Sequence, residues 1–287
     1  MRVLLHILAW LPLPVLHGLG WAAGWLLWLV PNSRKRTALV NVARCFPELP
    51  VIGQRRLVRR GLINEGKSAF EMPSFWVGPA QRVLASVRGE RGGNVVEEAL
   101  APGKGMILLT PHLGSWEPPA LKFSVTHVAS GLYKPQPGVF DELALRGRQR
   151  FGARMLATEI GIARKMVEVL NRGETVYFLP DQDPPEGAGV FAPYFGIQAH
   201  TPTLVANLVR KSQARVVIYW GERLPWGRGF VAHWMHAPEG VYSRDVKTSV
   251  AALNAVLETC VRECPEQYWW GYKRFRRRPP GEPKFYG

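Results

Sequence analysis

The sequence is poor in cysteine and contains no internal repeat. Its three cysteines, Cys45, Cys260 and Cys264, match neither a zinc-ligand spacing nor a disulfide framework. We therefore expect a reducing compartment, with Cys260 and Cys264 as small buried residues of one helix. Low-complexity linkers are also absent, which excludes a largely disordered chain and favours a single folded domain.

Acidic residues are scarce as well. The 287 residues include 22 Asp and Glu against 37 Lys and Arg, which gives a formal charge of +15 and an isoelectric point near 10.2. A surface of this kind attracts polyanions, namely nucleic acid, anionic lipid headgroups or an acidic protein. The hydrophobic content of 47% is sufficient for the core of one elaborated α/β domain.

Charge is missing altogether from residues 3–33. At about 1.5 Å per residue, a helix of this length exceeds the roughly 30 Å of hydrocarbon in a bilayer. Pro12 and Pro14 predict a kink, so we expect either a kinked span or a short interfacial helix followed by a membrane helix over residues 14–30. A hydrophobic core helix is the alternative, and a cleaved signal peptide fits less well because the apolar run is too long.

The residues that follow this run fix its expected orientation. Arg34, Lys35 and Arg36 come directly after it, whereas only Arg2 precedes it. The positive-inside rule therefore predicts that the remainder of the chain lies on the cytoplasmic side. We divide the chain into a membrane anchor, residues 1–33, and a domain on the cytoplasmic face of the membrane, residues 34–287.

Beyond the anchor, helical and strand patterns alternate. Apolar strands separated by helices predict an α/β fold, with a central mostly parallel or mixed sheet flanked by helices. The predicted strands are residues 105–110, 175–180, 214–220 and 229–235. The predicted helices are residues 54–70, a short helix and turn within 95–105, one that begins near Trp116 and Glu117 with Ser115 as N-cap, one that opens at Thr201 and Pro202, and one over 245–263.

The segment T-P-H-L-G-S-W-E, residues 110–117, lies where the first predicted strand gives way to a helix. Functional groups gather beyond the carboxyl ends of strands in such sheets. Glu117 could turn back toward His112 and bind one ring nitrogen, which leaves the other nitrogen as a base. By spacing alone a structural pair is favoured over a catalytic one, and zinc is disfavoured because no second His or Cys stands at ligand spacing nearby.

A second polar segment, D-Q-D at residues 181–183, follows the strand predicted at residues 175–180. Paired acids at a strand end fit a general acid or a metal site. We prefer a supporting role, in which Asp181 and Asp183 hold the loop and nearby arginines by charge-assisted hydrogen bonds.

Several blocks along the chain carry a family resemblance. They are R-x-x-x-x-N-x-x-x-C-F-P-E at 36–48, H-L-G-S-W-E at 112–117, Y-K-P at 133–135, R-G-R-Q-R-F-G at 146–152, D-Q-D at 181–183, F-A-P-Y-F-G at 191–196, A-H-T-P-T at 199–203 and P-E-Q-Y-W-W-G-Y-K-R-F at 265–275. This ordered set covers most of the chain and resembles the lipid A biosynthesis acyltransferases, a branch of the glycerolipid acyltransferases with the H-x-x-x-x-E motif.

The resemblance implies a glycerol-phosphate acyltransferase-like fold and an acyl transfer. The donor is an acyl-acyl carrier protein, and the acceptor is the hydroxyl of a 3-hydroxyacyl chain on a lipid A precursor. His112 is then the general base and Glu117 its orienter. Because a thioester is a reactive donor, neither a metal nor another cofactor is expected.

Basic residues are expected to complete the site. Arg150 is favoured over Arg148 as the donor to the developing oxyanion, and both, with Lys134, are alternatives for binding lipid phosphate. The residues expected to support the site are Ser115, Tyr133, Asp181 and Asp183.

Other functions are compatible with parts of the sequence. The acceptor could be a glycerophospholipid or an amino-acid lipid. A non-enzymatic membrane protein that binds nucleic acid is disfavoured because no recognised nucleic-acid motif is present. The basic tail, residues 273–280, is predicted to meet anionic headgroups or the acidic carrier protein, or to be merely solvated. F-A-P-Y-F-G is either a wall for the acyl chain or an ordinary apolar entry from a loop into a helix.

Overall fold

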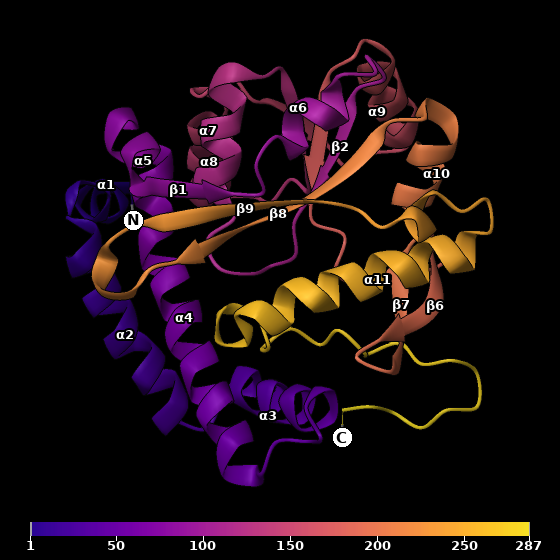
Figure 1. Cartoon of the computed structure of the whole chain (residues 1–287). Helices are drawn as coiled ribbons and strands as arrows, with labels where there is room; N and C mark the ends of the chain where they lie inside the picture. Colours follow the sequence, from indigo (N-terminus) through magenta and orange to yellow (C-terminus); the bar gives the residue numbers. More distant parts are fainter. Residues whose placement is uncertain (1, 287) are drawn as a thin grey trace.

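The chain forms a central sheet with helices on both faces and a helical N-terminal segment along one side (Figure 1). The structure is a computed structural model that describes residues 2–286. The sheet has seven strands, and among them only β8 and β9 pair antiparallel. In spatial order the strands are β1 (Val87–Arg91), β9 (Phe230–His236), β8 (Arg215–Arg223), β2 (Met106–Leu109), β5 (Thr175–Phe178), β3 (Ala129–Tyr133) and β4 (Arg154–Ala157).

The helices and a separate hairpin complete the fold. The hairpin is β6 (Gly189–Tyr194) and β7 (Ile197–Pro202). The helices are α1 (Arg2–Trp10), α2 (Leu13–Leu29), α3 (Ser33–Cys45), α4 (Val51–Val77), α5 (Ala80–Ser86), α6 (Val95–Leu100), α7 (Glu117–Thr126), α8 (Val139–Gln149), α9 (Ile162–Asn171), α10 (Leu204–Ser212) and α11 (Val246–Glu263), with the short 3-10 helices η1 (Pro225–Gly227), η2 (Glu239–Tyr242) and η3 (Pro265–Gln267).

The predicted α/β class with a mostly parallel sheet is confirmed, and the four predicted strands are β2, β5, β8 and β9. Two local predictions are wrong. Thr201 and Pro202 do not open a helix but end β7, and α10 begins at Leu204. F-A-P-Y-F-G is not the entry from a loop into a helix, because residues 191–194 belong to β6 and residues 195–196 form the turn to β7. Hairpin pairing with β6 overrides the helix-start signal that Pro202 gives.

Strand β2 shows why the sheet is covered on both sides. All four of its residues are buried, and successive side chains of a strand point to opposite faces. Met106 and Leu108 pack with residues of α6 and α7. Ile107 and Leu109 pack with residues of α9, α10 and α11. The apolar run therefore forms a fully buried central strand, as its composition predicts.

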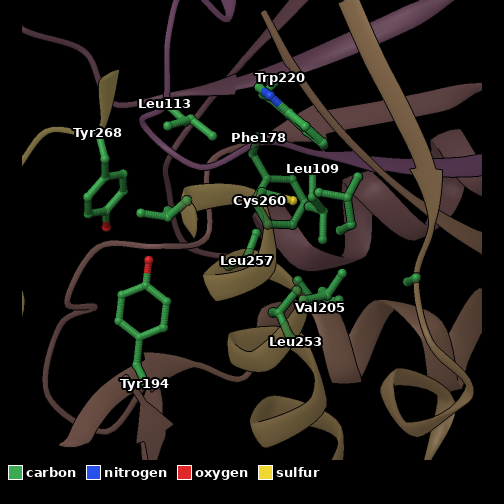
Figure 2. Close-up of a cluster of buried hydrophobic side chains, with 14 of the residues drawn as sticks. Leu109, Leu113, Phe178, Tyr194, Val205, Trp220, Leu253, Leu257, Cys260 and Tyr268 are labelled. Carbon is green, nitrogen blue, oxygen red and sulfur yellow. The ribbon is translucent and has the colours of Figure 1, made fainter. Parts of the chain in front are cut away.

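The core on the α11 side extends to the end of the sheet that carries the polar loops. Figure 2 shows Leu109 and Phe178, from the ends of β2 and β5, packed with side chains of α10 and α11. The hydroxyls of Tyr194 and Tyr268 face one another at the border of this cluster. Cys260 belongs to the same cluster, and burial raises the pKa of its thiol to about 12. It is a packing residue, as predicted.

The N-terminal segment is a set of helices bent around α4 rather than one straight helix. Helix α2 ends at Leu29, and Asn32 caps α3 by accepting a hydrogen bond from the Lys35 backbone at 2.8 Å. Within residues 2–286 no single helix has the length and apolar character needed to cross a bilayer, and α2 and α3 meet that test only together, with a bend of 82°. The apolar run is thus broken into α1 and α2 next to the two prolines, as predicted, but neither helix is a clear membrane span.

Helix α2 lies in backbone contact with α4. A Cβ atom at Gly24 would lie 2.3 Å from the Cα of Ile63, and one at Gly66 would lie 2.2 Å from the carbonyl oxygen of Gly20. Any larger residue at these positions would separate the two helices. The opposite side of α1 and α2 is apolar but uncovered. Its large side chains are between 41% and 73% exposed and are Val3, Leu4, Ile7, Trp10, Val15, Leu19, Trp21, Leu26 and Leu29.

Candidate functional site

His112 and Asp181 meet at the carboxyl ends of neighbouring parallel strands. His112 follows β2, Asp181 follows β5, and these two strands pair in register. The Asp181 carboxylate accepts hydrogen bonds from the His112 ring nitrogen Nδ1 at 2.7 Å and from the His112 backbone nitrogen at 2.9 Å. One carboxylate therefore fixes both the main chain and the ring of His112.

This contact sets the chemical state of the imidazole. With Nδ1–H donating to Asp181, the lone pair lies on Nε2, which is 3.2 Å from the amide nitrogen of Gln182. Burial alone would raise the pKa of Asp181, but the charge of the His112 ring and the hydrogen bonds from His112 lower it below its usual range. Asp181 is thus an anion that can stabilise an imidazolium.

Two indole rings enclose the imidazole. The ring centroids of Trp116 and Trp269 lie 5.1 Å and 5.2 Å from that of His112. The Trp269 backbone nitrogen also donates to the His112 carbonyl oxygen at 3.1 Å. These contacts leave the His112 side chain 16% exposed. Trp269 belongs to the motif at residues 265–275. No local sequence pattern predicted its contact with His112, because the two residues are far apart in the chain.

Glu117 does not bind His112 in the described part of the chain, so the predicted contact between them is wrong. Its carboxylate, 5% exposed, instead accepts hydrogen bonds from Arg148, with Nε at 3.0 and 3.2 Å from its two oxygens and a further bond from Nη2. Glu117 lies in the first turn of α7, where the chain has already turned away from the imidazole. Asp181, expected only to hold arginines, takes the place predicted for Glu117.

Arg148 and Arg150, the two predicted donors to the oxyanion, have different partners in the structure. Arg148 belongs to the last turn of α8, whereas Arg150 is the C-cap residue that follows the helix. Arg150 donates to the Phe75 carbonyl oxygen at 2.8 Å, whereas Arg148 binds Glu117. Burial alone would lower the pKa of Arg148, but Glu117 raises it above its usual range. Arg148 is therefore a permanent cation beside Glu117.

The other predicted residues are distributed around the site. Ser115 is buried but does not cap α7, whose N-cap is Trp116. Tyr133 ends β3 and is half-buried, and Lys134 is exposed just beyond it. Among residues 2–286, no hydrogen bond or ion pair connects the side chain of Lys134 or Tyr133 with His112 or Glu117.

Asp183 holds the C-terminal segment, as predicted for an acid that pins arginines. Its buried carboxylate accepts from His200 Nδ1 at 2.8 Å and from Arg276 Nε at 2.6 Å. Arg274 is 3% exposed and donates to the carbonyl oxygen of His200 and to the Thr201 hydroxyl, both at 2.6 Å. Part of the basic tail is thus a structural clamp rather than a solvated end.

The loop that carries His112 requires two glycines. Gly114 has φ 62°, and a Cβ atom there would lie 2.0 Å from the Gly221 carbonyl oxygen. A Cβ atom at Gly221 would lie 2.0 Å from the Ser115 carbonyl oxygen. Only glycine allows β8 and the loop to approach so closely. The Gly-Ser pair therefore positions the loop against β8 rather than folding Glu117 back onto His112.

A buried ionic network lies behind this loop. Arg223 of β8 donates to the Gly114 carbonyl oxygen at 3.2 Å and to Glu71 at 3.0 Å, and His17 of α2 binds the same carboxylate at 2.7 Å. Burial alone would raise the pKa of Glu71, but the charge of Arg223 and the hydrogen bonds from His17 and Arg223 lower it to about 2. The network connects the N-terminal helices with the His112 loop.

We expect Glu71→Gln to lower the free energy of unfolding by about 3–5 kcal/mol, because it leaves the Arg223 cation buried without a counter-ion. A folded-state pKa depressed from 4.5 to about 2 stabilises the fold above pH 4.5. That stabilisation is lost as the pH falls toward 2, so the gap between the variant and the wild type should narrow in this window. Denaturant unfolding at several pH values measures both effects.

Glu90→Gln, in the exposed pair with Lys122, is the control and should lower the free energy of unfolding by less than about 1 kcal/mol. An equal loss in both variants would contradict the role of the network.

A metal centre has no evident place among the described residues, since residues 2–286 contain no group of three or more His, Cys, Asp and Glu side chains able to hold a metal ion. The chemistry that the site offers comes from four side chains. They are an imidazole with a free lone pair (His112), its carboxylate partner (Asp181), and a guanidinium held by a second carboxylate (Arg148 and Glu117).

Comparisons with known proteins identify relatives along nearly the whole chain. The model of the family described as bacterial lipid A biosynthesis acyltransferase matches residues 2–277. The lipid A biosynthesis lauroyltransferase of Escherichia coli (strain K12) is 30% identical over 284 residues, covering 98% of this chain and 92% of that protein. The palmitoleoyltransferase and the myristoyltransferase of the same organism are 28% and 26% identical, over 96% and 94% of this chain and 90% and 82% of their own lengths.

Proposed function

The chain belongs to the bacterial lipid A biosynthesis acyltransferase family, and we propose that it moves a fatty acyl chain from an acyl-acyl carrier protein to a 3-hydroxyacyl hydroxyl of a lipid A precursor. The observation that carries the mechanism is the His112–Asp181 pair, which leaves the lone pair of the ring on Nε2, where its protein neighbour is the Gln182 amide at 3.2 Å. A general base of this kind activates a hydroxyl for attack.

In the proposed reaction, the hydroxyl oxygen attacks the thioester carbonyl carbon while Nε2 of His112 takes its proton. Asp181 stabilises the resulting imidazolium. The tetrahedral intermediate then breaks its carbon–sulfur bond, and the imidazolium returns the proton to the leaving thiolate. The products are an ester on the acceptor and a carrier protein with a free thiol. The incoming hydroxyl takes the position next to Nε2 that the Gln182 amide occupies at 3.2 Å.

Arg148 is proposed to stabilise the negative charge on the thioester oxygen. Its Nε and Nη2 groups bind Glu117, while Nη1 has no hydrogen-bond partner within residues 2–286. The Arg148 side chain is 23% exposed, whereas Glu117 is 5% exposed. Glu117 therefore acts through Arg148, by holding the guanidinium and neutralising it before substrate binds. This assigns Glu117 a positioning role in place of the one predicted from the sequence.

We propose that the enzyme attaches to the cytoplasmic face of the inner membrane through α1 and α2. Their exposed side is a continuous array of large apolar residues, of a kind that soluble surfaces seldom present. Arg34, Lys35 and Arg36 follow α2 and favour the cytoplasmic side. The net charge of +15 suits the acidic carrier protein that delivers the acyl chain to this surface.

Transfer assays with defined donors and acceptors test the proposal. Purified protein receives labelled acyl-acyl carrier protein or acyl-coenzyme A, together with either a lipid A precursor that has free 3-hydroxyacyl hydroxyls or a glycerophospholipid. We expect product only with the carrier-protein donor and the lipid A precursor, and this product should be heavier than the precursor by one fatty acid minus water. Protein with His112→Ala is the control for spontaneous transfer. Product from the glycerophospholipid alone would reject lipid A as the acceptor.

A further inference from the structure

A second feature, outside the acyl-transfer site, combines cations with aromatic rings. A cavity of about 420 Å³ lies where α2, α4, the β8–β9 turn and η3 meet. His112, Asp181, Glu117 and Arg148 do not line it. The side chains that matter for the argument are Trp21, Trp25, Arg59, Arg60, Lys67 and Glu266.

The cavity has an excess of unpaired positive charge. Arg59, Arg60 and Lys67 form no ion pair with any residue in the described part of the chain. Arg223 also contributes to the lining, but Glu71 neutralises it at 3.0 Å. One further carboxylate, that of Glu266, lines the cavity. The three free cations therefore outnumber the single free anion, which favours an anionic ligand.

Among the cations of the cavity, Lys67 is the one whose charged form an anion would stabilise most clearly. It is half-buried on α4, and burial together with the nearby charge of Arg223 lowers the pKa of its ammonium. An anion bound beside Lys67 would offset both effects, because an opposite charge stabilises the charged form. Arg60 adds a guanidinium, whose planar donors match phosphate oxygens.

The aromatic wall indicates where this ligand comes from. Trp21 and Trp25 belong to α2, and Trp21 is 52% exposed beside the apolar surface of that helix. The Arg59 guanidinium lies 5.1 Å from the ring centroid of Trp25. Tryptophan rings favour the headgroup level of a bilayer. The cavity thus lies at the border between the apolar face and the basic body, where lipid phosphates would be.

We propose that this cavity binds the phosphate group of an anionic membrane phospholipid, at a site separate from the acyl-transfer centre. The inference rests on the proposed membrane attachment through α1 and α2. The apolar face would enter the acyl-chain region, while Arg59, Arg60 and Lys67 hold a headgroup and so fix the orientation of the enzyme at the surface.

Two double variants with the same loss of charge test the proposal. Arg60→Gln with Lys67→Gln removes two cations of the cavity, and Arg55→Gln with Arg56→Gln removes two exposed cations of the same helix outside it. Binding of the full chain to phosphatidylcholine vesicles, with and without phosphatidylglycerol, is measured by co-sedimentation at fixed ionic strength. Circular dichroism melting shows that both variants fold.

The expected results distinguish specific binding of a lipid phosphate in the cavity from long-range electrostatic attraction between the protein and anionic vesicles. Long-range attraction alone weakens binding to the anionic vesicles by up to about 30-fold in either variant. An occupied cavity adds a further loss of about tenfold or more in the Arg60/Lys67 variant only. Equal losses in both variants would overturn the proposal. So would displacement of the protein from vesicles by inorganic phosphate at constant ionic strength, because the occupant would then be soluble phosphate.

The same proteins distinguish this inference from the proposed catalytic function. Both double variants should retain acyl transfer to a detergent-dispersed acceptor, and His112→Ala should bind vesicles as the wild type does. If the wild type transfers no acyl chain but shows the difference between variants, the lipid site stands and the catalytic proposal fails. If the wild type does not bind anionic vesicles, the lipid site fails whatever the transfer assay shows.

Discussion

His112→Ala is expected to reduce kcat for acyl transfer by about 10²–10⁴-fold, the range that a positioned general base contributes. The variant lacks the only group in the proposed mechanism that accepts the hydroxyl proton. The free energy of unfolding should also fall, by about 1–3 kcal/mol, because the buried Asp181 carboxylate loses the hydrogen bond from the His112 ring, so kcat is compared per folded enzyme. Steady-state transfer kinetics and thermal unfolding measure the two quantities.

A second histidine provides the control for this prediction. His236 is exposed and pairs with Glu98 on the surface, so His236→Ala should leave kcat within about twofold of the wild type. Near-full transfer activity in purified and folded His112→Ala would remove His112 from the mechanism. In that case another base would have to be sought, whatever the family membership of the chain.

Asp181→Asn is expected to lower kcat by about 10²–10⁴-fold with little change in KM. An asparagine can still accept a hydrogen bond, but it carries no charge to stabilise the imidazolium and allows the wrong ring tautomer. Because the carboxylate contacts His112 at 2.7 Å and not the substrate in the proposed reaction, the loss should appear in kcat. Transfer kinetics at saturating and limiting acceptor separate the two constants.

Two neighbouring carboxylates provide the comparison for Asp181. Asp183→Asn removes an acid from the same loop that contacts His200 and Arg276. It should lower the melting temperature while kcat per folded enzyme changes by only a few fold. Glu117→Gln should weaken the hold on Arg148 and also reduce kcat. If Glu117→Gln were inactive while Asp181→Asn kept more than a third of wild-type kcat, Glu117 would be the orienter that the sequence predicted.

The difference between Asp181 and Glu117 shows how far local spacing extends. His112 and Glu117 are five residues apart, and their closeness in sequence suggested a direct contact. Helix α7 begins at Glu117, and the Glu117 carboxylate binds Arg148 of α8, which is 31 residues away in the sequence. Asp181 lies 69 residues from His112 and reaches it only because β2 and β5 are adjacent in the sheet. Strand order is a property of the whole fold, which no local pattern contains.

In the N-terminal segment, too, local sequence patterns did not predict the contacts between distant residues. The absence of charge from residues 3–33 predicts a membrane anchor, and in the structure large apolar side chains of α1 and α2 are exposed. It did not reveal the contact of α2 with α4 through Gly20, Gly24 and Gly66. Glycines in two segments more than thirty residues apart give no sign that they belong to one interface. The proposed lipid-binding cavity could not be predicted from the sequence either, because its lining residues come from segments that are far apart in the chain.

The sequence by itself determined the α/β class, the central buried strands, the position of His112 at a strand end and, through its ordered motifs, the acyltransferase family. These follow from local chemistry, because apolar runs, turn residues and motif order are all properties of neighbouring residues. Only the tertiary structure decided which carboxylate holds His112, which arginine accompanies Glu117, and how β8 supports the T-P-H-L-G-S-W-E loop. Those choices depend on distances between groups that the chain separates by tens of residues, and packing of the sheet and its helices sets them.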